Sequence, residues 1–596
     1  MQVYEAPLRD MRFVLHELHQ EDGFGDLPAH GEFTPDLVDA VLDEAARLAR
    51  EVLLPLNRVG DEQGCRLENG VVYTPAGFPQ AYRRFCEGGW VSIAGDPRFG
   101  GQGMPETVNK LVEEMTSSAN VAFGLYPGLS HGATVALGAY GSDELKSLYM
   151  ERLTDGRWAG TMCLTEAHCG TDLGLLRTRA VPQGDGSYRI NGAKIFISGG
   201  DQDLTENVVH LVLARLPDAP KGTKGISMFL VPKYLPNADG SLGNANGVTV
   251  TAIEHKMGIN GTSTCQLAFE DSQGWLVGEP NKGMAAMFTM MNSERLSVGI
   301  QGLGIGEAAY QAAAWYARDR VQGRSLTGPK YPDRDADPII VHPDVRRMLM
   351  TMRAYNEGTR ALAGWVARAL DAEKHSPDPE VCQRAGDLVA LMTPVVKAIT
   401  TDLGFESANL AVQVYGGHGY IRESGVEQYV RDARIAMIYE GTNGVQALDL
   451  VGRKLPAHMG RSLRAFFHPV SSFIEENRGE GPLQKMIEGL GQAFGALQLS
   501  TATIAERSLK DPEEAGAAAT DYLHLLGLVA IGYCFARAAK IAVARVAEGS
   551  GEAAFYQAKL ATARFYFERV LPQTASLFMA IKAGKSSMMA LEDTAF

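Results

Sequence analysis

The sequence predicts a mainly helical protein with a central antiparallel β domain and an additional helical domain at its C-terminal end. Three observations support this fold class. Apolar residues recur at helical spacing over 35–153. Short alternating or β-branched runs replace that pattern near Trp158. Long helical patterns resume after Gly283 and continue almost to the last residue.

About four domains are expected, because the chain has 596 residues and a domain averages roughly 150. The changes of pattern along the chain place their boundaries. We expect an N-terminal helical domain at 1–157, the β domain at 158–282, a second helical domain at 283–455 and the additional helical domain at 456–596.

Each domain has its own local signals. Glycine and proline in segments such as 99–105 separate the first helices. In the β domain, Asn191-Gly192 lies between two strand-like runs and predicts a two-residue hairpin turn, because both residues tolerate a positive φ. Four further helices are expected after Leu455, at 463–476, 483–509, 515–547 and 553–583.

The composition excludes several classes of protein. A formal net charge of −14 would repel nucleic acid, which is therefore not an expected partner. No apolar run reaches the roughly 18 residues of a membrane-spanning helix, and residues 1–19 do not resemble a signal peptide. Apolar runs such as 523–533 are expected to be core rather than lipid-facing, so membrane association is not expected and the expected location is the cytoplasm.

Neither the cysteines nor the histidines have metal-ligand spacing. The seven cysteines include no Cys-x-x-Cys pair, so neither a disulfide framework nor a zinc site is expected. Cys163 and Cys169 are interpreted as loop and core thiols. The thirteen histidines, His168 and His418 included, are interpreted as loop residues, and no metal is predicted.

Two glycine clusters flank one predicted helix. They are Gln413-Val-Tyr-Gly-Gly-His-Gly-Tyr420 and Glu440-Gly-Thr-Asn-Gly444. Bare amides at such turns can approach phosphates or a flat ring system, although either cluster alone would also fit a helix cap. A third cluster, Gly302-Leu-Gly-Ile-Gly306, is interpreted as helix packing, since no strand precedes it as a dinucleotide-binding turn requires.

Here the chain resembles the acyl-CoA dehydrogenase family, whose signature Q-x-x-G-G-x-G-Y leads to I-Y-E-G-T. Both elements are present in order. Three further segments match the family's C-[LV]-T-E-P-x-A-G-S-D loop, its K-x-W-I-T strand and its K-M-G turn: 162–172, 194–198 and 256–258. The segments 292–295 and 316–322 match its N-x-E-R helix and Y-A-x-x-R-x-Q element. The resemblance covers about 34–455 and implies a fold of helical, β-barrel-like and helical-bundle domains, followed here by the additional helices.

The resemblance implies FAD as the cofactor. Positions that match the family's FAD contacts are Met162, Leu164, Thr165, Gly170, Thr171, Phe196, Ile197, Ser198, Thr442 and Asn443. Positions that match contacts to the FAD of a neighbouring subunit are Arg320, Gln322, Gln413, Gly416 and Gly417. A shared site of this kind implies a homodimer or a homotetramer.

Glu440 matches the family's catalytic base, which removes the α-proton of a saturated acyl-CoA while a hydride passes from the β-carbon to the flavin. Apolar Met437, Ile438 and Tyr439 are expected to desolvate its carboxylate and so strengthen it as a base. Without the motif, Glu440 would be read as a solvated helix-end residue. By resemblance Arg295 supports the base and the substrate, with a surface ion pair to Glu294 or Glu307 as the alternative. The substrate contacts implied are Thr171, Glu294, Arg295 and Gly441.

Three departures from the family pattern affect the substrate contacts more than the flavin contacts. Ala167-His168, Gly323-Arg324 and Asn260-Gly261 replace the usual residues of their motifs. They resemble a branch of about this length that includes bacterial long-chain enzymes of fatty-acid β-oxidation and methylthiopropionyl-CoA dehydrogenases. Electron-transfer flavoprotein is the acceptor that the resemblance implies.

Two alternative functions belong to other classes. One is a DNA-associated alkylation-response flavoprotein, which would need a basic C-terminal face, whereas the charges after Leu455 roughly balance. The other is an oxygen-reacting flavin oxidase or monooxygenase, which the retained Glu440 disfavours.

Overall fold

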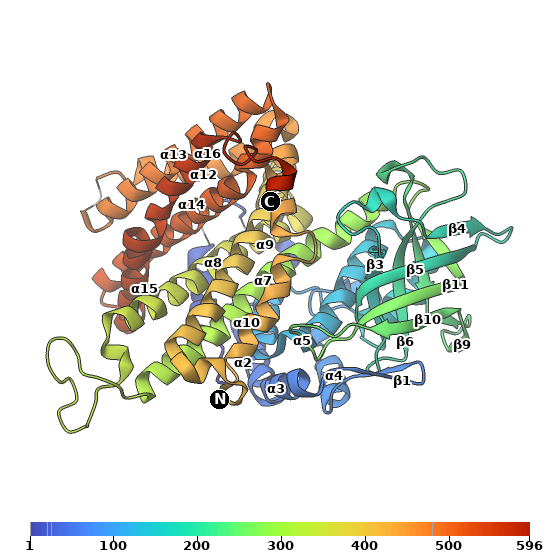
Figure 1. Ribbon diagram of the computed structural model, residues 1–596, viewed down its shortest axis with the longest axis horizontal. Helices are drawn as coiled ribbons and strands as arrows, with labels where there is room; N and C mark the ends of the chain where they lie inside the picture. The colour runs from blue at the N-terminus through green and yellow to red at the C-terminus, as the bar shows by residue number, and fades with distance from the viewer. Residues whose placement is uncertain (1, 21, 26, 480) are drawn as a thin grey trace. The chain divides into compact units, whose positions relative to one another are not determined.

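The computed structural model describes residues 2–20, 22–25, 27–479 and 481–596. The chain folds into two compact units, drawn in Figure 1. Unit 1 comprises Met1–Ala46, Glu106–Glu114 and Val298–Phe596, and unit 2 comprises Arg47–Pro105 and Met115–Ser297. Three helices begin in one unit and end in the other: α2 (Pro35–Leu48), α5 (Glu106–Tyr140) and α7 (Gly283–Asp319).

Unit 2 is built around a seven-stranded sheet in the order β3-β6-β7-β11-β5-β4, with β10 paired to β11. The strands of this sheet are β3 (Trp158–Cys163), β4 (Arg179–Pro182), β5 (Tyr188–Ser198), β6 (Asn207–Ala214), β7 (Ser227–Pro232), β10 (Val248–Ile253) and β11 (Thr264–Val277). A separate pair is β8 (Tyr234–Pro236) with β9 (Leu242–Ala245). The helices that lie wholly in unit 2 are α3 (Leu54–Gln63), α4 (Phe78–Glu87) and α6 (Asp143–Thr154).

The sheet confirms the predicted β domain and adds one feature, a parallel pair. β3 and β6 run parallel, whereas the other strand pairs are antiparallel. Every residue of β6 is buried, because its two faces pack into different cores. Leu211 packs with helical residues such as Leu153, and Val212 packs with residues of other strands such as Ile197.

The hairpin predicted at Asn191-Gly192 is wrong. β5 continues through both residues, and Gly192 pairs with Phe269 of β11. Glycine is required there for a different reason, since a side chain would lie 2.5 Å from the hydroxyl of Thr178. An Asn-Gly turn does form at Asn69-Gly70, where φ is 51° and 79° and the turn joins β1 (Arg66–Glu68) to β2 (Val71–Tyr73). This short sheet interrupts the region that was expected to be helical.

Unit 1 is helical. Besides its share of α2, α5 and α7, it contains α1 (Leu8–Phe13), α8 (Pro343–His375), α9 (Pro379–Tyr415), α10 (Glu427–Arg434), α11 (Asn443–Asp449), α12 (Arg461–Glu476), α13 (Gln484–Ser508), α14 (Pro512–Ala547), α15 (Ala553–Phe565) and α16 (Thr574–Ala583). The predicted helix 553–583 is two helices, α15 and α16, because Pro572 lacks the amide hydrogen that an α-helix needs there.

Glycines allow the long helices of unit 1 to pack closely. Gly302 of α7 faces the backbone of α9, where a side chain would lie 2.8 Å from the carbonyl of Thr400, so the interpretation of 302–306 as helix packing is confirmed. Gly527 of α14 faces α9 in the same way, because a side chain there would lie 3.0 Å from the Ile399 side chain. The additional C-terminal helices therefore pack directly on the helices that precede the Glu440 segment.

Two helices of unit 1 are long and apolar enough to cross a membrane by length and composition. They are the segment Pro379–Tyr420, which contains α9, and α14. The most apolar windows of these helices are 78% and 83% buried inside the protein, as is usual for core helices. The expectation that no apolar run is long enough to span a membrane is therefore corrected. The interpretation of 523–533 as core is unchanged.

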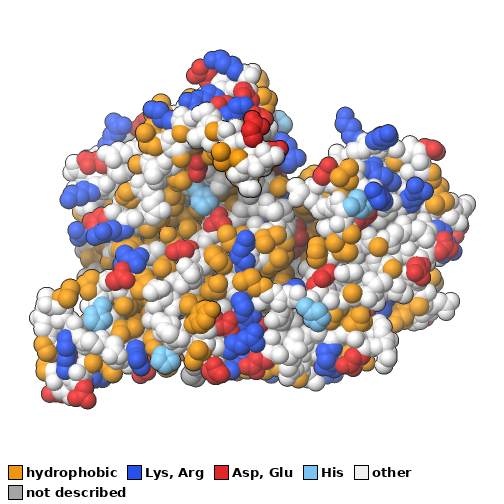
Figure 2. All heavy atoms as spheres, viewed as in Figure 1, with side chains coloured by type: hydrophobic (Ala, Val, Ile, Leu, Met, Phe, Trp, Pro, Cys, Tyr) orange, Lys and Arg blue, Asp and Glu red, His pale blue; other side chains and the backbone are white. Residues whose placement is uncertain are grey.

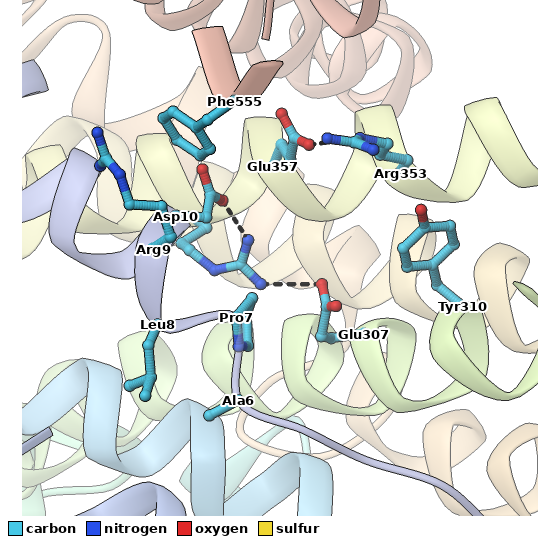
Figure 3. A pocket seen from close by; sticks show the side chains of 11 residues that line it. Ala6, Pro7, Leu8, Arg9, Asp10, Glu307, Tyr310, Arg353, Glu357 and Phe555 are labelled. Atoms are coloured by element: carbon cyan, nitrogen blue, oxygen red, sulfur yellow. Dashed lines mark hydrogen bonds and ion pairs between the residues drawn. The ribbon is translucent and has the colours of Figure 1, made fainter. Parts of the chain in front are cut away.

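Five charged side chains form a buried cluster in unit 1, called the ionic cluster below: Asp10, Glu114, Glu307, Arg360 and Lys559. The Arg360 guanidinium donates to Glu114 at 2.6 Å, to Glu307 at 2.9 Å and to Asp10 at 2.5 Å. Lys559 of α15 pairs with Asp10. Figure 3 shows Asp10 and Glu307 among the residues that line a cavity of about 450 Å³, and Arg360 also belongs to its lining. The cluster joins the N-terminal segment and α15 to α8.

Candidate active site

The segment that was predicted to hold the flavin, 162–172, begins with the last two residues of β3 and continues as a loop that bonds to β5. The amide of Ile195 donates to the carbonyl of Thr165 at 2.9 Å, and Lys194 donates to the carbonyl of Leu164, also at 2.9 Å. A Cβ added at Gly170 would lie 3.5 Å from the Thr165 methyl group. The structure thereby brings Leu164, Thr165 and Gly170 beside the strand that contains Phe196.

Glu166 fixes the shape of this loop. Its carboxylate accepts hydrogen bonds from the amides of Arg177 and Thr178 and from the Lys194 ammonium at 2.9 Å. Burial opposes ionisation of Glu166, but the charge of Lys194 and the bonds from Thr178 and Arg177 outweigh it and lower the pKa of Glu166 to about 2. Lys194 is completely buried, so the two charges depend on each other.

Glu166→Gln is expected to lower the free energy of unfolding by about 3–5 kcal/mol at neutral pH, because it leaves the buried Lys194 without a charged partner. The folded-state pKa of Glu166 is below the ordinary value of 4.5, so its stabilising contribution is present above that value and is lost as pH falls from about 4.5 towards 2. Thermal unfolding across this range should show a weaker acid dependence for the variant.

The matched control for that experiment is Glu279→Gln, which removes an exposed carboxylate paired with Lys282 in the same unit. We expect a change below about 0.5 kcal/mol for it. An equal loss of stability in both variants would contradict the role assigned to Glu166.

Phe196 has the geometry of a platform for a flat ring. Its φ is +59°, a strained value for a bulky residue, and 60% of the side chain is exposed. Ile197 beside it is buried and Ser198 is half-buried. An exposed aromatic ring on the strand that bonds to Thr165, with Thr171 exposed on the same loop, fits the isoalloxazine and the hydrogen-bonding groups of FAD.

The remaining site residues predicted in unit 2 are buried. Met162 belongs to β3, where it packs in the core. Glu294 and Arg295 lie on α7 and are 4% and 5% exposed, so the alternative of a surface ion pair for Arg295 is wrong. The Arg295 guanidinium lies 5.7 Å from the centre of the Phe288 ring and donates to Asn292. Its charge is therefore held inside the helical part of the unit.

Glu440 occupies a left-handed turn in unit 1. Its φ is +55° and that of Gly441 is +82°. For a glutamate this conformation costs roughly 1–2 kcal/mol, so the surrounding contacts must hold it in place. The carboxylate side chain is half-buried, and Ile438 is 46% exposed. Ile438 therefore does not provide the desolvation expected from the sequence.

Polar contacts behind the turn hold this conformation. Gln446, which is fully buried, donates its amide to the carbonyls of both Glu440 and Gly441 at 3.0 Å. The buried Lys397 of α9 donates to the carbonyl of Gly441 at 2.9 Å. Thr442 caps α11 by accepting from the amide of Val445. Each of these contacts acts on the main chain of the segment. The turn then sets the direction in which the Glu440 side chain leaves the backbone.

Asn443 is the most connected side chain of this segment. Its oxygen accepts from Lys397 at 2.9 Å, and its nitrogen donates to Thr401 at 3.0 Å and to Asp402 at 2.8 Å. These bonds hold α11 on α9. The sequence had suggested Asn443 as a cofactor contact, and the structure gives its amide an internal bracing role.

The residues predicted to reach a neighbouring subunit lie elsewhere in unit 1. Gln413 is at the C-terminal end of α9, about 24 Å along the helix from Lys397, and Gly416 and Gly417 follow it in the 3-10 helix Gly416–Tyr420. The ring of Tyr316 stacks on Tyr415 at 4.0 Å, which joins the start of the segment 316–322 to this end. Arg320, Gln322, Gln413, Gly416 and Gly417 are all exposed. The structure therefore separates this group from Glu440 within one chain.

Several functional candidates were missed from the sequence, namely Lys397, Gln446, Asp402 and the pair Glu166–Lys194. One signal was available, since Lys397 interrupts the apolar run 395–399 and a lone lysine there must be paired. Within the described ranges one trio of potential metal ligands lies close together, Glu166, His168 and Cys169, within 4.8 Å. The Lys194 ammonium on Glu166 opposes a cation at that place.

A cationic cavity of about 700 Å³ lies at the loop end of unit 2. Its lining includes Arg177, Arg215 and Lys221 against one carboxylate, Asp172. Arg215 donates to the main-chain carbonyls of Gly174, Leu176 and Pro220, so its charge is not neutralised by these partners. On the face drawn in Figure 2, Lys and Arg side chains gather over this end of the β domain. The cavity suits a phosphorylated ligand.

Four sequence profiles match successive parts of the chain. They are described as acyl-CoA dehydrogenase N-terminal domain (37–157), middle domain (161–272) and C-terminal domain (281–455), and as acetyl-CoA dehydrogenase C-terminal like (466–592). The 3-methylmercaptopropionyl-CoA dehydrogenase of Ruegeria pomeroyi is 42% identical over 96% of this chain and 97% of its own length. A broad-specificity linear acyl-CoA dehydrogenase of Mycobacterium tuberculosis, FadE5, is 35% identical over the whole of both chains.

Solved structures show the same fold. Caenorhabditis elegans ACDH-11 in complex with C11-CoA aligns with a TM-score of 0.78 over 96% of this chain and 92% of its own, at 20% identity. An acyl-CoA dehydrogenase from Bacillus anthracis complexed with FAD aligns with a TM-score of 0.74 over 94% and 90%, also at 20% identity. Both alignments include the additional C-terminal helices, since they extend over nearly the whole chain.

Proposed function

The chain belongs to the acyl-CoA dehydrogenase family, and from this premise we propose that it converts a saturated acyl-CoA to the trans-2-enoyl-CoA, as in fatty-acid β-oxidation. It is an oxidoreductase of a family that binds FAD. The observation that supports the reaction most directly is Glu440 on its left-handed turn, with the main chain held by Gln446 and Lys397.

Glu440 is the proposed base for the α-proton. A thioester α-proton is weakly acidic, so the base must be fixed at short range and at the correct angle. The turn supplies this, because both carbonyls next to the side chain are bonded to buried donors. The proton passes from the α-carbon to the Glu440 carboxylate. Bound FAD supplies the acceptor for the hydride that leaves the β-carbon.

The cationic cavity of unit 2 supports a CoA ester as the substrate. CoA contains a 3′-phosphate and a pyrophosphate, and the lining offers three permanent cations for them. A charge-assisted contact to one phosphate contributes about 1.5–3 kcal/mol. We therefore propose that this cavity receives the phosphorylated end of the substrate.

A short thioether acyl chain is the second candidate substrate. The relative from Ruegeria pomeroyi is named for 3-methylmercaptopropionyl-CoA and is 42% identical to this chain over nearly its whole length. The broad-specificity linear enzyme is 35% identical. The higher identity to the first of these relatives is the observation that supports a thioether substrate.

Electron-transfer flavoprotein is the proposed acceptor, and a homodimer or homotetramer the proposed assembly. The exposure of Gln413, Gly416 and Gly417 supports a shared site, because these residues lie away from Glu440 within one chain. A DNA-associated role is not favoured. On the face drawn in Figure 2, acidic and basic side chains alternate over the C-terminal helices rather than forming a basic surface.

Anaerobic titration of the purified holoprotein with acyl-CoAs tests the proposal. Butyryl-, octanoyl-, palmitoyl- and 3-methylmercaptopropionyl-CoA are added in turn while flavin absorbance is followed. We expect at least one to bleach the flavin with formation of the 2-enoyl product. The matching 3′-dephospho-CoA ester should bind about tenfold more weakly, since it lacks one charge-assisted contact.

Absence of bleaching by every acyl-CoA would overturn the proposed reaction. Equal affinity for the CoA and dephospho-CoA esters would overturn the proposed place of the 3′-phosphate alone. Rapid turnover to peroxide with oxygen as the sole acceptor would assign the protein to the oxidases.

A further inference from the structure

We propose that the additional C-terminal helices position the Glu440 turn through His524 and Asp402. This inference rests on the proposed function, because it gives His524 of α14 and Asp402 of α9 a part in aligning the base. Neither residue is suggested to touch the substrate or FAD. Both are positioning residues that act through Asn443.

Asp402 links the two parts of unit 1 with its two carboxylate oxygens. His524 donates from Nε2 to Oδ2 at 2.9 Å, and Asn443 donates from Nδ2 to Oδ1 at 2.8 Å. The carboxylate therefore accepts one bond from the additional helices and one from the segment that begins two residues after Gly441. If either bond is lost, the Asp402 carboxylate is held through one oxygen only and can rotate.

Asn443 passes this restraint to the turn. Its oxygen accepts from Lys397, and the same ammonium donates to the carbonyl of Gly441, both at 2.9 Å. Gly441 follows Glu440 directly, and both have a positive φ. A strained backbone conformation persists where several contacts hold it in place. Gln446 and Lys397 hold this turn directly, and His524 of α14 supplies a third restraint.

Close packing keeps α14 in register with this network. A Cβ added at Gly527, one turn after His524, would lie 3.0 Å from the Ile399 side chain of α9. A Cβ added at Gly516 would lie 3.9 Å from the Leu448 side chain of α11. His524 is thus carried on a helix that touches both α9 and α11, and its imidazole is held in reach of Asp402.

The competing interpretation is an ordinary partly exposed ion pair. The side chains of His524 and Asp402 are 30% and 18% exposed, and such pairs contribute little to stability. A positioning role therefore has to be sought in catalysis and in local mobility rather than in the melting temperature.

Arg461 offers a matched control. It joins another C-terminal helix, α12, to α9 by bonds to Asp387 at 2.6 and 3.1 Å, and Asp387 precedes Asp402 by fifteen residues on α9. Its side chain is 38% exposed, close to the value for His524. Arg461→Ala removes a comparable link between the same parts of the unit without touching the network.

Three holoenzyme variants test the inference: His524→Ala, His524→Gln and Arg461→Ala. We expect His524→Ala to lower the limiting rate of flavin bleaching about tenfold and to change substrate affinity by less than about twofold. The expected loss of rate is smaller than the roughly hundredfold loss that a 1 Å displacement can cause. His524→Gln retains a side-chain N–H donor and should restore the rate to within about threefold. Arg461→Ala should leave the rate within about twofold.

Hydrogen exchange of the substrate-free holoenzyme gives a second readout. Amides of 440–446 should exchange faster in His524→Ala and unchanged in Arg461→Ala. Equal effects of both alanine variants, or unchanged exchange in His524→Ala, would overturn the inference. If the wild-type protein bleaches with no acyl-CoA, the proposed function fails, and the exchange result still decides whether His524 restrains the turn.

Discussion

Glu440→Gln is expected to retain FAD and to lose flavin bleaching by any acyl-CoA. The variant keeps the volume of the side chain and the polar contacts of the main chain, so the turn should persist. It removes the carboxylate that accepts the α-proton. A general base contributes roughly 10²–10⁴-fold to a rate, and the weak acidity of the α-carbon places this reaction at the upper end. Anaerobic stopped-flow measurement of flavin absorbance gives the rate directly.

The control for this variant is Glu506→Gln, which removes a carboxylate that is 74% exposed on α13. It should bleach at the wild-type rate. Normal bleaching by Glu440→Gln would mean that another group removes the proton. Loss of FAD from Glu440→Gln would instead mean that the residue holds the cofactor, and the base would have to be sought again.

Arg360→Met is expected to lower the free energy of unfolding by about 3–5 kcal/mol, the cost of breaking a buried ion network by removing one partner. Asp10, Glu114 and Glu307 would remain buried after the loss of their shared guanidinium. Methionine nearly fills the space, so the loss reports on charge rather than on a cavity. The midpoint of urea unfolding, followed by tryptophan fluorescence, measures it.

Arg347→Met on the same helix is the control, because that arginine is 54% exposed and pairs with Asp344 at the surface. The shift of its unfolding midpoint should correspond to a change of less than about 0.5 kcal/mol in the free energy of unfolding. A stable Arg360→Met protein would show that the three carboxyl groups of the ionic cluster take up protons when the guanidinium is removed.

Sequence patterns predicted the order of helices and sheet because periodicity reports burial directly. Two of the chain's five Asn-Gly pairs show the limit of local signals. Asn69-Gly70 forms a turn for which no prediction was made, whereas the predicted turn at Asn191-Gly192 is replaced by an extended strand that pairs with β11 and lies close to Thr178. The second outcome depends on partners distant in sequence, which a single sequence does not display.

The same reasoning separates the parts of the site. The turn at Glu440 and the segment 162–172 were found because their residues are contiguous and match motifs. Lys397, Asp402 and His524 act on that turn from 43, 38 and 84 positions away from Glu440 along the chain. Such contacts exist only once α9, α11 and α14 have packed.

The positive φ of Glu440 reduces stability at the same position where the proposed reaction needs a carboxylate. Glycine at this place would relieve roughly 1–2 kcal/mol of backbone strain and remove the carboxylate with it. A lineage under selection for thermal robustness alone would drift towards glycine here. Retention of the acid at such a site in a descendant sequence would therefore record continued selection for turnover, and its loss would mark a protein that has left this chemistry.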